Sequence, residues 1–103
     1  MKTVLVRYKT TPKGAEINVA LVHAVFDELR SLAPAGFRYA TYRLDDGVSF
    51  VHIASYEGPS APLTGLASFK AFQKDLKERC VELPVVTELS AVDSYASVAS
   101  GAR

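Results

Sequence analysis

Four stretches of the chain have the alternating or continuous apolar pattern of β-strands, and turn-forming residues bound each of them. They are residues 3–9, 37–44, 48–56 and 85–92. The two middle stretches flank Asp46-Gly47, a dipeptide that favours a two-residue hairpin turn. Pro84 cannot donate a backbone hydrogen bond, so we expect it to open the last strand.

Two further segments repeat their apolar residues at the period of a helix. Residues 15–32 form an apolar arc over about five helical turns, and Pro34-Ala35-Gly36 ends this helix. Residues 66–80 form a second amphipathic helix, with Asp75 and Arg79 one turn apart on its solvent side. The elements therefore follow the order strand, helix, strand, strand, helix, strand.

This order predicts an α+β domain of the ferredoxin-like βαββαβ type. Right-handed crossovers place the four strands in the spatial order 4-1-3-2, with both helices on one face of an antiparallel sheet. If Asp46-Gly47 forms the turn, Thr41 lies opposite His52. A three-residue turn with a bulge would instead exchange the faces of one strand relative to the other.

The sheet face away from the helices is the expected site of self-association. In the two-residue-turn register this face holds large apolar and aromatic side chains, namely Leu5, Phe37, Tyr39, Phe50 and Tyr56. Such a surface is too apolar to remain in water on a stable monomer. We therefore expect a two-fold homodimer in which two sheets face each other.

Composition adds mainly exclusions. The 103 residues carry a formal net charge of +1, without the surplus of Lys and Arg that binding to nucleic acids or anionic membranes requires. The length fits one domain, which we place at residues 1–95, and the small residues of 96–103 predict a flexible tail. We recognise no signal peptide or membrane span, and the single cysteine, Cys80, fits a reducing cytoplasm.

His52 is the sharpest candidate for chemistry. It lies in the middle of a strand, and its imidazole can act as a general base or bind a polar ligand near neutral pH. A hydrogen-bonded histidine packed in the dimer interface explains the same position. Arg7 and Arg43 are expected on the same face, where they could hold an anionic oxygen or form ion pairs across the interface.

Aromatic residues are the other candidates for contact with a substrate. Tyr39, Phe50 and Tyr56 could stack on an aromatic molecule, although aromatic side chains also commonly anchor interfaces. The chain has no Gly-rich phosphate loop and no spaced set of Cys and His ligands. We therefore expect neither a metal nor a cofactor.

Three segments carry a resemblance to a known family. They are the opening strand Lys2-Thr3-Val4-Leu5-Val6-Arg7-Tyr8-Lys9, the strand Phe50-Val51-His52-Ile53 and the helix start Leu66-Ala67-Ser68-Phe69-Lys70-Ala71-Phe72. With the order of elements over residues 1–95, they resemble the dimeric α/β-barrel superfamily, and within it the antibiotic biosynthesis monooxygenase-like group. The resemblance implies a ferredoxin-like protomer that dimerises into an α/β barrel.

The members of this group include cofactor-independent oxygenases of aromatic polyketides, haem-degrading enzymes and small proteins of no known activity. Haem-degrading members are associated with a tryptophan, and this chain has none. The resemblance thus implies an oxygenase that acts without flavin or metal on a small aromatic or quinol-like molecule, which we expect in a pocket on the uncovered sheet face. In that hypothesis His52 is the base, and Arg7 or Arg43 stabilises an oxyanion.

A second hypothesis is a non-catalytic homodimeric module of the same fold that binds a ligand or serves only to dimerise. No catalytic constellation stands out from the packing residues, which favours this alternative. An effector-sensing domain of a transcription regulator is disfavoured by the near-neutral charge.

Overall fold

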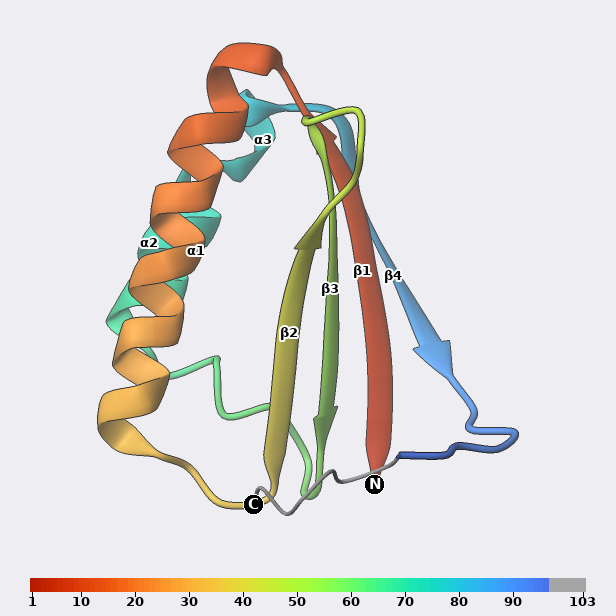
Figure 1. The fold of residues 1–103 in the computed structure, drawn as a ribbon. Helices are drawn as coiled ribbons and strands as arrows, with labels where there is room; N and C mark the ends of the chain where they lie inside the picture. The colour runs from red at the N-terminus through yellow and green to blue at the C-terminus, as the bar shows by residue number, and fades with distance from the viewer. Residues whose placement is uncertain (97–103) are drawn as a thin grey trace.

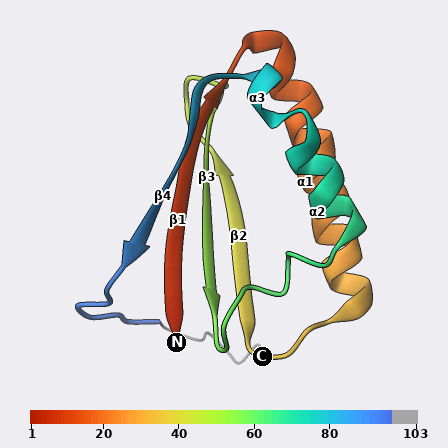
Figure 2. The same cartoon turned by 180° about the vertical axis from the view of Figure 1, so that it is seen from behind.

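A computed structural model describes residues 1–96, and the predicted tail 96–103 lies outside this range except for its first residue. The elements are β1 (Lys2–Thr10), α1 (Pro12–Leu32), β2 (Phe37–Arg43), β3 (Ser49–Tyr56), α2 (Ala67–Lys74), α3 (Leu76–Arg79) and β4 (Cys80–Leu89). The strands form one antiparallel sheet in the order β2-β3-β1-β4, with the helices on one side of it (Figure 1 and Figure 2). The predicted ferredoxin-like fold and strand order, read from the opposite edge, are confirmed.

The hairpin of β2 and β3 has the predicted register, with Thr41 opposite His52. The predicted two-residue turn is wrong: the Gly47 N–H donates to the Leu44 carbonyl at 2.9 Å, so Asp45 and Asp46 are the central residues of the turn. The turn is held by the carboxylate of Asp46. This group accepts hydrogen bonds from the backbone N–H of Val48 at 3.0 Å and of Ser49 at 2.8 Å, and from the Ser49 hydroxyl at 2.6 Å. Because these bonds favour the ionised form, they lower the pKa of Asp46 to about 2.

Helix α1 begins at Pro12, earlier than the predicted Ala15. The Thr11 hydroxyl caps it by accepting a hydrogen bond from the Gly14 N–H at 2.9 Å, and proline fits the first helical position because it needs no backbone donor there. A Cβ at Gly14 would lie only 3.1 Å from the carbonyl oxygen of Arg79. Gly14 is therefore a point of close approach between α1 and the end of α3.

The second predicted helix is divided at Asp75 into α2 and the short α3. The residue before α2, Leu66, offers no capping side chain, and Glu28 of α1 supplies the cap instead. One Glu28 carboxylate oxygen accepts hydrogen bonds from the Ser68 N–H at 3.0 Å and from its hydroxyl at 2.5 Å, which lowers the pKa of Glu28. This contact ties the two helices together over the sheet.

Strand β4 begins at Cys80, so the expectation that Pro84 opens it is wrong. Pro84 lies inside the strand, where the pairing with β1 shifts register between Arg7 and Lys9. β4 is an edge strand, and a proline is tolerated there because a missing donor at an edge or a bulge breaks no central ladder.

No helix within residues 1–96 is long and apolar enough to cross a membrane.

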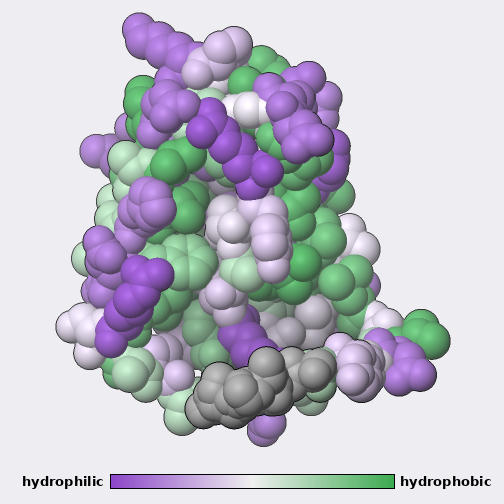
Figure 3. Space-filling model, in the orientation of Figure 1, coloured by the Kyte–Doolittle hydropathy of each residue, from purple (hydrophilic) through white to green (hydrophobic). Residues whose placement is uncertain are grey.

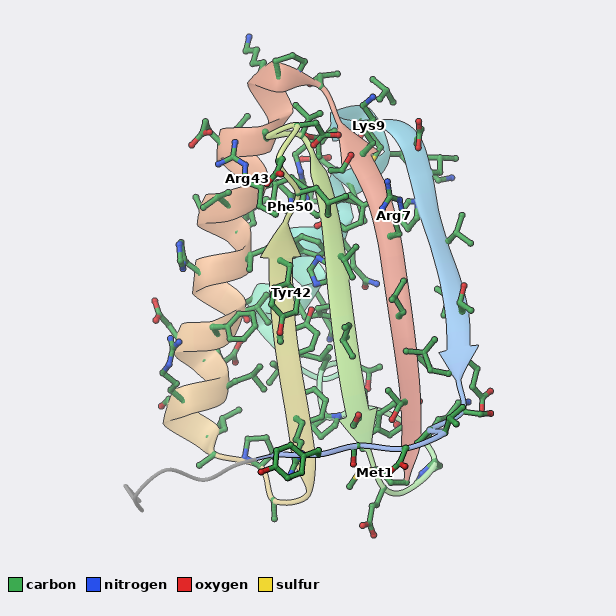
Figure 4. All side chains as sticks on the ribbon, turned by 45° about the vertical axis from the view of Figure 1, so that its right-hand side comes forward. Met1, Arg7, Lys9, Tyr42, Arg43 and Phe50 are labelled. Carbon is green, nitrogen blue, oxygen red and sulfur yellow. The ribbon has the colours of Figure 1, made fainter. Side chains whose placement is uncertain are left out.

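The predicted assignment of the two sheet faces is wrong for the aromatic residues. The face under the helices carries Val6, Tyr8, Phe37, Tyr39, Phe50, His52, Ala54 and Tyr56. The uncovered face carries Leu5, Arg7, Ala40, Tyr42, Val51, Ile53 and Val85, and Figure 4 shows Arg7 and Tyr42 there. Alternation correctly grouped the residues of each strand, but both faces are apolar, so the pattern does not tell which one the helices cover.

Candidate functional site

A cavity of about 300 Å³ lies between α2 and the helix-covered face of the sheet, so the expectation of a pocket on the uncovered face is wrong. Its lining residues are Val4, Val6, Tyr8, Tyr39, His52, Ala54, Tyr56, Ala61, Leu63, Phe69, Phe72, Gln73, Leu76, Pro84 and Val86. No Asp, Glu, Lys or Arg is among them. A site of this size and composition suits a small, uncharged, largely apolar ligand.

The polar end of the cavity is built around His52, which is 5% exposed. Its Nε2 lies 2.7 Å from the Tyr8 hydroxyl. Its Nδ1 lies 2.7 Å from the Tyr39 hydroxyl and 3.0 Å from the Thr41 hydroxyl. Because both ring nitrogens are bonded to protein hydroxyls, the groups that present hydrogen-bonding capacity to a ligand are the tyrosines.

Burial makes this end of the cavity electrically neutral near pH 7. It lowers the pKa of His52 to about 4, since water is excluded from the imidazolium form. It raises the pKa of Tyr39 to about 12 and raises the pKa of Tyr8 as well, because a buried phenolate is equally costly. The site therefore contains two phenols and an imidazole, all uncharged.

The hydrogen bonds continue from Tyr8 into the protein interior. The Asn18 side-chain N–H donates to the Tyr8 hydroxyl at 2.7 Å. The guanidinium of Arg79 donates to the Asn18 carbonyl oxygen, from Nη2 at 3.1 Å and from Nε at 3.3 Å, and to the Phe72 carbonyl at 2.9 Å. We call the chain Arg79, Asn18, Tyr8, His52 and Tyr39 the polar relay.

Sequence reasoning missed the two inner members of this relay. Arg79 was expected to pair with Asp75 in solvent, but it is 6% exposed and lies over the Phe72 ring at 5.4 Å. Asn18 is fully buried. One signal was available for Asn18, since it lies one and two turns before Val22 and Val25, on the apolar arc of α1. The amphipathic period of the second helix gave no comparable signal for Arg79.

The structure places some of the predicted site residues at the cavity and others away from it. His52, Tyr39 and Tyr56 line the cavity, whereas Phe50 stacks on Tyr8 with ring centres 5.6 Å apart and does not line it.

The two predicted arginines are not at the cavity. Arg43 pairs with Glu16 of α1 at 2.7 Å and lies over the Phe50 ring at 5.8 Å. Arg7 extends from the opposite face of the sheet (Figure 4). The expectation that Arg7, Arg43 and His52 share one uncovered face is therefore wrong, and the arginine that reaches His52 through hydrogen bonds is Arg79.

Within residues 1–96, no three side chains of His, Cys, Asp or Glu gather closely enough to hold a metal ion. The cavity itself offers aromatic walls and the neutral hydroxyls of the relay. These hydroxyls can act on a ligand through hydrogen bonds.

Comparison with solved structures identifies the fold. The chain matches Rv0793 from Mycobacterium tuberculosis with a TM-score of 0.74, at 23% identity over 92% of this chain and 98% of that one. A crystal structure of an antibiotic biosynthesis monooxygenase matches with a TM-score of 0.75, at 17% identity over 90% of this chain and all of that one. SnoaB, a cofactor-independent oxygenase from Streptomyces nogalater, matches with a TM-score of 0.61, at 20% identity over 93% and 97%.

No protein-family model and no curated protein sequence matches the chain. The structural matches confirm that the chain has the fold of antibiotic biosynthesis monooxygenase-like proteins, as the resemblance implied. At these identities the likeness concerns the fold, and chemistry has to be argued from the site.

Proposed function

We propose that the cavity binds a small aromatic or quinol-like molecule and that the protein oxidises it as a cofactor-independent monooxygenase. The observation that carries the proposal is an uncharged, aromatic-walled cavity whose polar groups converge at one end, on His52, Tyr8 and Tyr39. A flat apolar ring system with one oxygen at its edge has the matching distribution of polarity.

The proposed reaction draws its electrons from the substrate. A quinol that reacts with one O2 to give a hydroxylated quinone and one water balances without another reductant. One oxygen atom enters the ring, the other leaves as water, and the ring supplies all four electrons. The likeness to SnoaB, whose description is a cofactor-independent oxygenase, favours this reaction over one that needs flavin or metal.

The role of the protein is to bind the substrate away from water and to stabilise its ionised oxygen, the form that passes electrons to O2. The Tyr39 hydroxyl would donate a hydrogen bond to that oxygen. His52, the base proposed from the sequence, would act on the substrate only indirectly, because both of its nitrogens are bonded to the Tyr8 and Tyr39 hydroxyls. Arg7 and Arg43 have no part in this version of the site.

Oxygen uptake with 1,4-dihydroxynaphthalene tests the proposal. The protein should raise O2 consumption above the spontaneous rate, and 18O2 should place one labelled oxygen in 2-hydroxy-1,4-naphthoquinone. Tyr39→Phe should lower this rate, whereas Tyr95→Phe, a matched change at an exposed residue, should leave it unchanged. Binding without added O2 uptake would favour the non-catalytic ligand-binding module, and failure to bind would overturn both.

We also propose a homodimer formed through the uncovered face of the sheet. This face remains apolar with the residues now assigned to it: Leu5 and Ile53 lie at its centre, and Tyr42 and Val85 are 56% and 63% exposed. Figure 3 shows hydrophobic side chains gathered over the strands on the right of the view. Burying this surface against a second copy would remove it from water.

For the cellular compartment, we propose a reducing cytoplasm. Its support is the unpaired thiol of Cys80, the single cysteine of the chain.

A further inference from the structure

Arg79 determines which group donates and which accepts in each hydrogen bond of the polar relay. A guanidinium has only donors, so the Asn18 side chain must turn its carbonyl oxygen towards Arg79. The opposite orientation would place the amide N–H groups against the guanidinium N–H groups. The Asn18 amide nitrogen therefore points to Tyr8, and its N–H donates to the phenol oxygen.

This orientation decides where the Tyr8 proton goes. Among residues 1–96 the Tyr8 hydroxyl has two hydrogen-bond partners, Asn18 and His52, and Tyr8 is 2% exposed. Since Asn18 donates to it, the phenol can place its own proton in a hydrogen bond only by donating to His52 Nε2. If Nε2 also donated, the buried Tyr8 proton would lose that partner.

The state of His52 follows from Tyr8. With Nε2 accepting, the neutral imidazole carries its proton on Nδ1. The Nδ1–H then donates to the oxygen of Tyr39 at 2.7 Å, with Thr41 at 3.0 Å as a second acceptor. Tyr39 keeps its own proton, which it can donate to Thr41 or to a ligand oxygen in the cavity.

We propose that Arg79 and Asn18 are positioning residues which hold His52 in the Nδ1–H tautomer and so make the Tyr39 hydroxyl the hydrogen-bond donor to the ligand. In each hydrogen bond of the relay the donor is the member nearer Arg79, a buried cation, and the acceptor is the member nearer Tyr39. Hydrogen bonds aligned in this way polarise one another. The ligand thus presents a carbonyl or oxyanion to Tyr39, and not a hydroxyl that donates. This ligand preference rests on the proposed function, whereas the tautomer rests on the relay alone.

A single isosteric substitution should reverse the relay. In Asn18→Asp the carboxylate still accepts from Arg79, but it has no N–H for Tyr8. Tyr8 would then donate to the carboxylate, His52 would donate from Nε2 to Tyr8, and Tyr39 would donate to His52 Nδ1. The proton that Tyr39 offers to a ligand would be lost without any change in the shape of the cavity.

Nitrogen-15 NMR of the histidine rings at pH 7 tests the tautomer directly. The full-length wild type should give His52 as neutral imidazole with the proton on Nδ1, and Asn18→Asp should move it to Nε2. Exposed His23 serves as the internal reference, assigned with His23→Gln. A wild-type His52 protonated on Nε2 overturns the inference, and this result does not require the variant to fold.

Binding of two matched probes tests the ligand preference. 1-Tetralone and tetralin share a bicyclic skeleton, and only the tetralone has a carbonyl. The wild type should bind 1-tetralone about tenfold more tightly, the worth of one hydrogen bond, and Asn18→Asp and Tyr39→Phe should abolish this advantage. Equal affinity in the wild type overturns the assignment of Tyr39 as donor. If neither probe binds, the proposed function fails, while the NMR result still decides the tautomer.

Discussion

The guanidinium of Arg79 and the amide of Asn18 meet in the protein interior although 61 residues separate them in sequence. Nη2 and Nε of Arg79 lie 3.1 and 3.3 Å from the Asn18 oxygen, and both side chains are buried. The contact joins the end of α3 to the first half of α1, and through Tyr8 it reaches the sheet. One hydrogen-bonded chain therefore holds the helices, the sheet and the cavity in register.

Removal of the Arg79 side chain should be strongly destabilising. Arg79→Leu leaves the carbonyl oxygens of Asn18 and Phe72 without their donor, which predicts a loss of about 2–4 kcal/mol in the free energy of unfolding. Arg79→Lys should recover only part of this loss, because an ammonium cannot reproduce the planar set of donors. Urea denaturation measures both.

The control is Arg30→Ala, which removes an exposed ion pair to Asp27 on α1 and should cost at most about 0.5 kcal/mol. If Arg79→Leu and Arg30→Ala had the same free energy of unfolding, the relay would not contribute to the stability of the fold.

The stability of the fold should fall as the solution is acidified from neutral pH. The pKa of His52 is about 4 in the folded state and 6.5 in its ordinary state, so below 6.5 the unfolded chain gains a proton that the folded chain does not take up. At about 1.4 kcal/mol per pH unit, the loss should reach about 3 kcal/mol near pH 4. Urea denaturation between pH 7.5 and 4.5 measures this slope.

Two substitutions identify the group responsible. His52→Gln should flatten the pH dependence above about pH 5.5, whereas His23→Gln, at an exposed position of α1, should retain it. The lowered pKa values of Asp46 and Glu28 also make stability depend on pH, but they act only from about one unit above the ordinary carboxyl values of 3.8 and 4.5 downwards. A slope that persists in His52→Gln would show that another group is responsible.

The sequence predicted local features well and the site poorly, for identifiable physical reasons. The sequence predicts the hairpin register because it places the turn correctly between residues 44 and 49, although Asp45 and Asp46, and not Asp46-Gly47, are its central residues. Which face the helices cover depends on packing between distant segments, and Ile53 and His52 point to opposite apolar faces of the same strand. The contact between Arg79 and Asn18 also joins segments that are far apart in the sequence. The helical spacing of Arg79 from Asp75 indicated instead an ion pair on the surface.

A charge on the uncovered face should produce a monomer if the proposed dimer forms there. Ile53 lies on β3 between Leu5 of β1 and Ala40 of β2, so Ile53→Lys would bury a cation in the middle of the interface. Analytical ultracentrifugation should find the wild type as a dimer and Ile53→Lys as a monomer. Val92→Lys, at a residue that is 99% exposed, should remain a dimer. A monomeric wild type at micromolar concentration contradicts the proposal.

Filling the cavity should separate its role in binding from its role in the fold. Ala54 lies on β3 between His52 and Tyr56, is 5% exposed and lines the cavity wall. Ala54→Leu adds three carbons in space that the native core leaves open, so stability should change by less than about 1.5 kcal/mol. Affinity for 1-tetralone, measured by calorimetry, should fall at least about tenfold because the ligand and the new side chain compete for the same volume. Ala24→Leu on the exposed side of α1 adds the same carbons and should leave affinity unchanged. Unchanged affinity in Ala54→Leu would mean that the ligand binds elsewhere, and the role argued for Tyr39 would lose its basis.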